Sequence, residues 1–302
     1  RALAIFEKAK GPDNTDVAMI LSDLGYLYEI RDDYDSAEAL YKRALTIYEK
    51  ANSPDDVEMI LSALGDLYEN QDDYDSAEAL YKRELAIYEK VKGPDHPDVA
   101  RILSALGDLY ENQDDYDSAE ALYKRALAIY EKAKGPDHPD VATCLNNLGL
   151  LYKIQGDYDS AEALYKRALT IFEKAKGPEN PDVAMSLSNL GDLYEKRDDY
   201  DSAEALYKRA LTIYEKAKGP ENIFVVMCLG RLGNLYEKQG DYDSAEALYK
   251  RVLAIYEKIL GPDHPNVAVC LENLASLYRA TKRIPEANAL EKRAARIRAI
   301  KR

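Results

Sequence analysis

The stretch DVARILSALGDLYENQDDYDSAEALYKRALAIYEKAK, from Asp98 to Lys134, decides the fold of this chain. Apolar residues in its first half follow i, i+3, i+4, i+7 spacing, which is the pattern of one buried helix face. A polar break follows, and Asp115 or Asp117 is expected to cap the next helix, with Asp117 and Glu120 at capping-box spacing. A second apolar stripe then runs to Gly135, expected as an αL residue, and Pro136 ends the helix. The stretch therefore predicts two antiparallel helices.

This helix pair recurs along the whole chain. The glycine of a Leu-Gly pair returns every 42 residues, with one interval of 40, and alanine completes the series: Gly25, Gly65, Gly107, Gly149, Gly191, Gly233 and Ala275. Nearly all of the 25 tyrosines repeat in the same register. The tyrosines are therefore predicted to be architecture and not an aromatic binding site. A lone hairpin cannot bury both of its faces, so stacked copies must share a continuous core.

The fold class predicted from this pattern is all-α, a right-handed α-solenoid of antiparallel helix pairs without strands. One solenoid domain is expected over residues 1–302, with part of a second helix at residues 1–10. The seven repeats are expected at approximately 16–52, 56–92, 98–134, 140–176, 182–218, 224–260 and 266–302, the last being a C-terminal cap. Because the chain starts inside a helix and without Met, we expect it to be a fragment of a longer protein.

Charge and composition limit the classes of partner. The net charge is −14, which argues against nucleic acid or an anionic membrane as the main partner and permits basic ones. No apolar run approaches the roughly 18 residues of a membrane span. The sequence has no Gly-rich phosphate loop, HExxH motif or CxxC pair. We therefore expect no catalytic residues, no metal site and no cofactor, and the Asp-rich turns are interpreted as helix caps, since they lack the pattern of a calcium loop.

Cysteine and histidine each occupy one repeated position. The position of Cys144, Cys228 and Cys270 is held by isoleucine in three other repeats, which predicts small buried side chains. Reduced thiols suit the cytoplasm, the expected location. His96, His138 and His264 share their position with asparagines, so a capping role explains both residue types. Metal ligation would not tolerate that exchange.

Two irregularities interrupt the pattern. The loop Asn52–Asp55 is two residues short and is expected to shift the packing of the first two repeats. Phe224 stands where the six other repeats have Asp or Asn, on an expected loop. It either marks a contact surface or packs under the neighbouring loop.

The 42-residue repeat resembles those of kinesin light chain and its relatives within the tetratricopeptide class. The stretch LNNLGLLYKIQGDYDSAEALYKRALTIFEKAKGPENPDVA, from Leu145 to Ala184, carries the resemblance, which covers essentially the whole chain. The resemblance implies that the first helices line a concave groove. In kinesin light chains, the paired asparagines of an LNN motif hold extended cargo peptides together with nearby basic residues. That motif is complete here only at Leu145–Asn147, which puts an acidic kinesin-type cargo in doubt.

The resemblance implies a protein-interaction scaffold that holds an extended peptide or helix of a partner, and the absence of catalytic and metal motifs predicts that the chain is no enzyme. A sensor or regulatory arm of a larger signalling protein or enzyme is the alternative. The candidate peptide-binding residues are Asn146, Asn147, Lys153, Asn189, Lys196, Arg231, Asn234, Lys238 and Asn273. The ligand is expected across the fourth to sixth repeats, where basic side chains first appear. Earlier repeats carry Asp66 and Asp108, which would repel an acidic segment.

Overall fold

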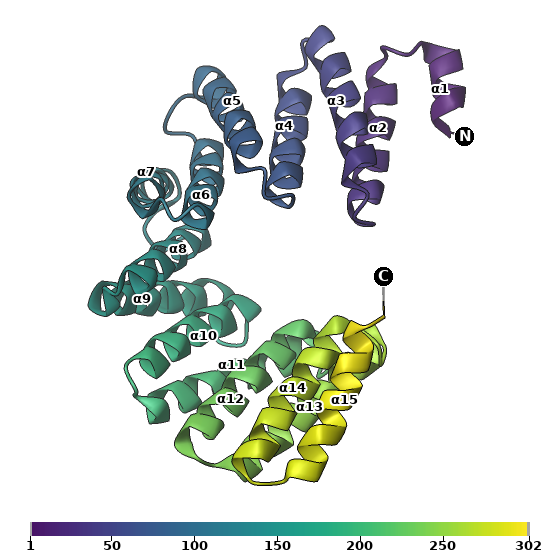
Figure 1. Ribbon diagram of the computed structural model, residues 1–302. Coiled ribbons are helices and arrows are strands. Elements are labelled where there is room, and N and C mark those ends of the chain that lie inside the picture. Colours follow the sequence, from purple (N-terminus) through teal and green to yellow (C-terminus); the bar gives the residue numbers. More distant parts are fainter. Residues whose placement is uncertain (1, 301–302) are drawn as a thin grey trace. The chain divides into compact units, whose positions relative to one another are not determined.

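The computed structural model describes residues 2–300, which form helices and the turns between them, with no strand in that range (Figure 1). The described helices are α1 (Ala2–Lys10), α2 (Thr15–Glu29), α3 (Tyr34–Lys50), α4 (Pro54–Glu69), α5 (Tyr74–Lys92), α6 (Pro97–Asn112), α7 (Tyr116–Lys134), α8 (Pro139–Gln155), α9 (Tyr158–Lys176), α10 (Pro181–Lys196), α11 (Tyr200–Lys218), α12 (Ile223–Gln239), α13 (Tyr242–Leu260), α14 (Pro265–Ala280) and α15 (Ile284–Arg298). The all-helical class predicted from the repeat is confirmed. Within residues 2–300, no helix is long and apolar enough to cross a membrane.

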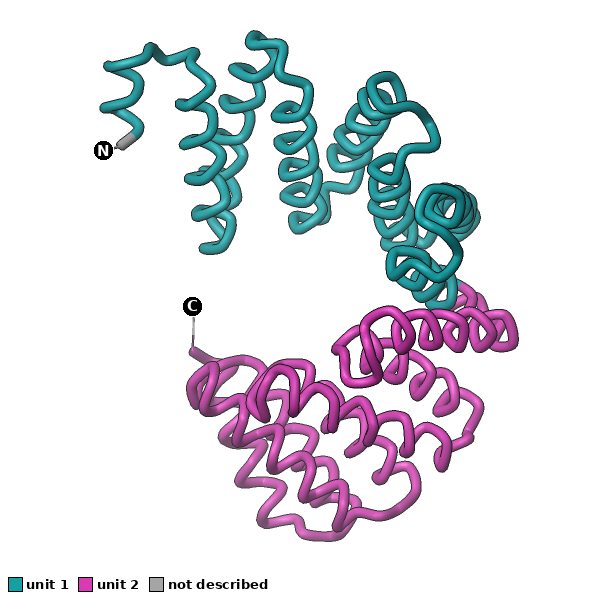
Figure 2. The backbone as a smooth tube through the Cα atoms, turned by 180° about the vertical axis from the view of Figure 1, so that it is seen from behind, with its two compact units in different colours: residues 1–151 teal, residues 152–302 magenta. Residues whose placement is uncertain are grey.

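The chain divides into two compact units, residues 1–151 (unit 1) and 152–302 (unit 2), which Figure 2 shows in different colours. The boundary falls inside α8, so the fourth repeat contributes to both. Each unit is described by itself below. The expectation of one continuous domain stays a prediction.

The first helix of every repeat except the second begins at a side-chain cap; α4 follows Ser53, whose side chain makes no capping hydrogen bond. The asparagine or histidine that precedes the helix accepts a hydrogen bond from the backbone N–H two residues later, as His96 Nδ1 does from Asp98 at 3.2 Å and Asn180 Oδ1 from Asp182 at 2.9 Å. Both residue types satisfy an N–H that the helix itself leaves open. The capping role predicted for this shared position is confirmed.

The second helices α3, α5, α7, α9, α11 and α13 are capped by aspartate, whereas α15 follows Arg283 without a side-chain cap. Asp115 accepts a hydrogen bond from the backbone N–H of Ser118 at 3.2 Å, and α7 begins with the next residue. Asp117 lies in the first turn of α7, so the capping box proposed for Asp117 and Glu120 is wrong. The reason is that α7 starts two residues earlier than that spacing requires.

The glycines that end the long second helices have positive φ but extended ψ. Gly135 lies at φ 88° and ψ 157°, and its N–H still bonds to the carbonyl of Glu131. The αL conformation expected there is therefore wrong. The extended ψ directs the chain away from the helix axis toward the next repeat. Only glycine enters this region without strain, so the residue type is required for a different reason than predicted.

A glycine and a tyrosine set the distance between the two helices of a repeat. A β-carbon on Gly107 would lie 2.6 Å from Cε1 of Tyr123, whose ring is fully buried against that backbone. The same contact recurs at Gly65 with Tyr81 and at Gly191 with Tyr207. In the last repeat, Ala275 replaces the glycine where Glu291 stands at the tyrosine position. The pair therefore changes together.

Each tyrosine also joins its repeat to the following one. Tyr81 packs with Ile102, Leu106 and Leu109 of α6 in unit 1, and Tyr207 packs with Leu232 and Leu235 of α12 in unit 2. Burial thus continues from repeat to repeat, as expected for a stack in which each hairpin needs its neighbour.

Second helices are linked on their own side by ion pairs one repeat apart. Arg125 of α7 contacts Glu89 of α5, and Arg209 of α11 contacts Glu173 of α9, both at 2.5 Å. These pairs are partly exposed, so each contributes little to stability, about 0–1 kcal/mol. Their regular spacing shows that successive second helices lie side by side.

We expect Gly107→Ala to destabilise the protein by about 1–3 kcal/mol, because the added methyl group overlaps the Tyr123 ring. Gly230→Ala is the matched control: Gly230 also lies within a helix, but a β-carbon there meets no atom within 4 Å. That control should gain about 0.5–1 kcal/mol from helix propensity. Thermal and urea melts of the two variants measure the difference, and equal effects would contradict the contact.

Candidate binding site

The candidate site lies on the first helices, where a ladder of polar contacts joins successive repeats from the second to the fourth in unit 1 and continues in unit 2. In unit 1, Asn112 donates to Glu69 at 3.0 Å and Asn147 donates to Asp108 at 3.1 Å. A carboxylate on one first helix therefore contacts a carboxamide on the next. The ladder shows that successive first helices lie side by side and share one face.

Unit 2 has the same ladder, with cations in place of the carboxamides. Arg231 pairs with Asp192 at 2.9 Å, and Lys238 pairs with Glu195 at 2.7 Å. Asp192 also lies 3.8 Å from the Lys153 ammonium group. Equivalent positions thus carry Asn147 in unit 1 and Arg231 in unit 2, so the face is acidic in one unit and balanced by cations in the other.

The ladder carboxylates have a second, structural partner. The hydroxyl of Tyr123 donates to Asp108 at 2.5 Å and lies 3.2 Å from Glu111. Tyr207 does the same with Asp192 and Glu195. The acidic residues on this face therefore hold the core tyrosines in place as well as giving the face its charge.

Asp108 has an unusual protonation equilibrium. Part of its side chain is exposed, but the surrounding helices desolvate the carboxyl group, which raises its pKa to about 6. The hydrogen bond from Tyr123 lowers this pKa, and the negative charges of Glu111 and Glu69 raise it. The charge of this part of unit 1 therefore changes near neutral pH.

The residues predicted from the sequence to bind a peptide fall into both units. In unit 1, Asn146 is buried and Asn147 is bonded to Asp108. In unit 2, Asn234 accepts a hydrogen bond from Tyr249 at 2.6 Å, so its oxygen is used inside the repeat. Lys196 and Asn273 are exposed. Because the expected ligand path from the fourth to the sixth repeat crosses both units, it stays a prediction.

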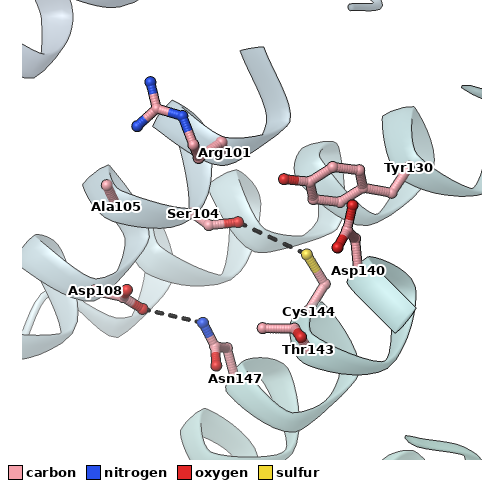
Figure 3. Close-up of a pocket in the computed structure, with 9 residues that line it drawn as sticks. All are labelled: Arg101, Ser104, Ala105, Asp108, Tyr130, Asp140, Thr143, Cys144 and Asn147. Atoms are coloured by element: carbon pink, nitrogen blue, oxygen red, sulfur yellow. Dashed lines mark hydrogen bonds between the residues drawn. The ribbon is translucent and has the colours of Figure 1, made fainter. Parts of the chain in front are cut away.

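A cavity of about 300 Å³ lies between the third and fourth repeats of unit 1 (Figure 3). Most of the residues that line it have polar side chains: Arg101, Ser104, Ala105, Asp108, Tyr130, Asp140, Thr143, Cys144 and Asn147. Figure 3 shows Asn147 directed at Asp108, and Ser104 directed at the Cys144 sulfur, 3.7 Å away. The cavity is thus part of the first-helix face.

Unit 2 has two cavities at equivalent positions, and apolar residues are more frequent among those that line them. One, of about 190 Å³, includes Met185, Asn189, Phe224 and Met227. The next, of about 230 Å³, shares Met227 and adds Val269 and Asn273. Met185, Phe224, Met227 and Val269 are between 37% and 47% exposed, so apolar groups remain open to solvent there.

Phe224 belongs to this apolar surface. It lies in the first turn of α12, which begins at Ile223, so its placement on a loop was wrong. Its backbone N–H is capped by Asn222, which extends the helix to include it. The ring stacks on Tyr214 with centroids 5.1 Å apart while 41% of the residue stays exposed. Phe224 therefore packs against Tyr214 of the preceding helix and also leaves part of its ring open to solvent.

The three cysteines line these same cavities. Cys144, Cys228 and Cys270 are buried and form no disulfide, as predicted from their shared position with isoleucine. Burial raises the pKa of the Cys144 and Cys270 thiols to about 11, so both stay protonated at neutral pH. They act as small apolar walls. No group of three or more His, Cys, Asp or Glu side chains placed to hold a metal ion occurs among residues 2–300.

Sequence reasoning missed the methionines of this face. Met19, Met59, Met185 and Met227 stand at one position of the first helix, six residues before the repeated glycine or its equivalent. All four are partly exposed. An apolar residue that recurs in the helix outside the buried stripe was the signal that could have identified them.

A model of the tetratricopeptide repeat matches residues 1–50, 56–132, 110–174, 152–216 and 224–299. Among solved structures, BtubC (BKLC) from P. vanneervenii is 27% identical, with a TM-score of 0.65 over 74% of this chain and 89% of that chain. A putative kinesin light chain of Podospora anserina with nearly identical repeats is 24% identical, with a TM-score of 0.60 over 68% and 97%. None of the curated protein sequences matches the chain.

A third solved structure places a similar array inside a larger protein. It is a signal transduction ATPase with numerous domains from Pyrococcus horikoshii, described as having a tetratricopeptide repeat sensor. Its identity to this chain is 16% and its TM-score 0.68, over 93% of this chain but 42% of that one. This likeness concerns the fold alone.

The Asp108 carboxyl should titrate with a midpoint near pH 6 when its carbon resonance is followed by NMR. Tyr123→Phe removes a hydrogen bond to the charged form, so it should raise that midpoint, while Glu111→Gln removes a neighbouring charge and should lower it. A midpoint near the ordinary aspartate value of about 3.9 in the unsubstituted protein would contradict the desolvation of this carboxyl.

Proposed function

Because the chain belongs to the tetratricopeptide repeat family, whose repeats generally mediate contacts between proteins, we propose that it is a non-catalytic scaffold that holds a segment of a partner protein. One observation carries the proposal: in each unit, the first helices carry polar ladder residues that also line a cavity on the same face. Such a face offers hydrogen bonds to a backbone and space for side chains.

Unit 2 has the features best suited to an ordered partner segment. Its two cavities share Met227 as a common wall, so neighbouring side chains of one segment can enter both. Methionine adapts its shape to different apolar groups. Arg231 lines the first of these cavities. Arg231 and Lys153 both lie near the carboxylate of Asp192, so two cations surround one carboxylate there. A segment with apolar side chains and a carboxylate complements this surface.

Unit 1 supplies the carboxamide expected to contact a peptide backbone. Asn147 uses its amide nitrogen on Asp108 and lines the cavity of Figure 3. Its carboxamide oxygen is an acceptor that a peptide N–H can use. The acidic neighbours Asp66 and Asp108 favour a basic or neutral segment there, and not an acidic one.

The alternative, a sensor or regulatory arm of a larger protein, is supported by one comparison. The chain matches less than half of the Pyrococcus horikoshii ATPase, whose description assigns its repeats a sensor role. In that case the same face would hold a partner and pass the signal to an attached domain. A cytoplasmic location, proposed from three free buried cysteines, suits both functions.

Two variants test the scaffold once a partner has been captured with the chain as bait and its contact segment mapped as a synthetic peptide. Asn147→Ala should weaken binding by about 1–3 kcal/mol, the cost of leaving a buried polar group unpaired. Met227→Asp should weaken it as well, because a charge enters both cavities of unit 2. Isothermal titration calorimetry measures both, and Thr212→Ala, exposed on a second helix, is the control.

The outcomes separate the two units. Loss of binding with Asp66→Ala but not with Asn147→Ala or Met227→Asp would place the ligand in the early repeats. If Asp66→Ala, Asn147→Ala and Met227→Asp all leave binding unchanged while Thr212→Ala weakens it, the site lies on the second helices. That result would refute the proposed face.

A further inference from the structure

Two aspartates at the same position of their repeats use one carboxylate oxygen alike and the other differently. Asp108 of α6 and Asp192 of α10 each follow the repeated glycine directly. In both, Oδ1 accepts a hydrogen bond from the core tyrosine, from Tyr123 at 2.5 Å and from Tyr207 at 2.6 Å. The second oxygen, Oδ2, therefore decides what else each carboxylate can hold.

In unit 2, cations of the chain itself contact this second oxygen. Arg231 lies 2.9 Å from Oδ2 of Asp192, and the Lys153 ammonium group lies 3.8 Å from the same atom. Arg231 comes from α12, the next first helix, and lines the cavity beside Asp192's repeat. The chain thus contains an example of a guanidinium group held at this position of the repeat.

In unit 1, neither of these cations is present at the equivalent position. Asn147 replaces Arg231, and Glu69 replaces Lys153. Asn147 donates to Oδ1 of Asp108, the oxygen that Tyr123 also uses. Among residues 2–300, no hydrogen bond or ion pair is formed to Oδ2 of Asp108. This oxygen is therefore open to a ligand.

The cavity of Figure 3 gives a ligand side chain room beside Asp108. Its volume is about 300 Å³, against about 190 Å³ for the cavity that Arg231 lines. Arg101 is a cation in its lining, but it donates to Glu84 at 2.5 Å, and Figure 3 shows its guanidinium group directed away from Asp108. A cationic side chain can therefore reach Asp108 without displacing Arg101.

We propose that the cavity beside Asp108 binds a lysine or arginine side chain of the partner segment, with Oδ2 of Asp108 as its ion-pair acceptor. This inference rests on the scaffold function proposed above and names the chemistry that unit 1 selects. The partner supplies the cation that Arg231 supplies from within the chain in unit 2. Charge-assisted hydrogen bonds are stronger than neutral ones, so the contact favours a cationic side chain over an uncharged one.

The proposed contact depends on pH because the cation binds the ionised form of Asp108. With a pKa of about 6, the ionised fraction falls about tenfold between pH about 7 and about 5, and affinity for a basic peptide should fall by the same factor. The titratable and charged groups around Asp108 are Glu69 on α4, Glu111 and Arg101 on α6, Tyr123 on α7, and Asp140 and Cys144 on α8.

The test presents a random library of short acetylated peptides to the full chain, so it needs no identified partner. The unsubstituted protein should retain peptides enriched in lysine or arginine. Asp108→Asn keeps an acceptor for Tyr123 and should lose this enrichment. Asp95→Asn is the matched control, because it removes an exposed carboxylate of unit 1 that pairs with Lys132, and it should keep the enrichment.

A second variant adds the cation instead of removing the acceptor. Asn147→Arg copies the residue of the sixth repeat and should fill the cavity, so it should also lose the enrichment. The new guanidinium group should lower the titration midpoint of Asp108 below about 6, which NMR measures without any peptide. This readout shows whether Asp108 accepts a cation, independently of the library.

The pH dependence is measured with one retained basic peptide at pH about 7 and about 5. Histidine gains charge near neutral pH, and His138 lies 3.5 Å from Asp140 in the cavity wall. His138→Asn is therefore measured in parallel. The fifth repeat has Asn180 as the equivalent cap, so the helix start is kept. The loss of about tenfold should appear in both proteins.

The outcomes separate this inference from the scaffold function. If the library yields no bound peptide, both proposals fail. If peptides bind without enrichment in lysine or arginine, or if the enrichment persists in Asp108→Asn, the cation site is wrong while the scaffold stands. Loss of enrichment in Asp95→Asn as well would show attraction by net charge alone. An unchanged Asp108 midpoint in Asn147→Arg would also overturn the proposed contact.

Discussion

Close contact between a glycine backbone and a tyrosine ring is the constraint on which the rest of the structure depends. The ring of Tyr123 occupies the space that a β-carbon of Gly107 would need. It brings the two helices of a repeat to a fixed distance and extends apolar burial into the next repeat. Where the tyrosine is absent, at Glu291, the glycine requirement disappears and Ala275 takes its place. One geometry is thus transmitted from repeat to repeat.

The same tyrosine links the core to the candidate binding face. The hydroxyl of Tyr123 is held by two carboxylates of the first helix, and one of them, Asp108, in turn contacts Asn147 on the following first helix. The scaffold therefore fixes where charge lies on the face. The residue that pairs with each carboxylate differs between repeats while the core stays the same. It is Asn147 in unit 1 and Arg231 in unit 2. Selectivity for a partner can change while the fold stays constant.

Much of the local structure was predictable because it depends on short-range patterns. Apolar spacing located the helices, and the exchange of asparagine with histidine identified their caps, since both side chains can accept from the same backbone N–H. Finer points failed for local reasons. The conformation of Gly135 depends on the direction the chain must take to reach the next repeat, and the placement of Phe224 depends on the cap provided by Asn222.

The sequence by itself determined the all-helical repeat, the recurrence of its tyrosines and the burial of its cysteines, because each repeats with a period set by one helix pair. Only the tertiary structure decided which charged side chains meet. Contacts such as Asn147 with Asp108, or Arg101 with Glu84, join residues on different helices whose distance depends on packing. The same holds for the cavities: their volume is what remains after buried side chains from two repeats have filled the space between them.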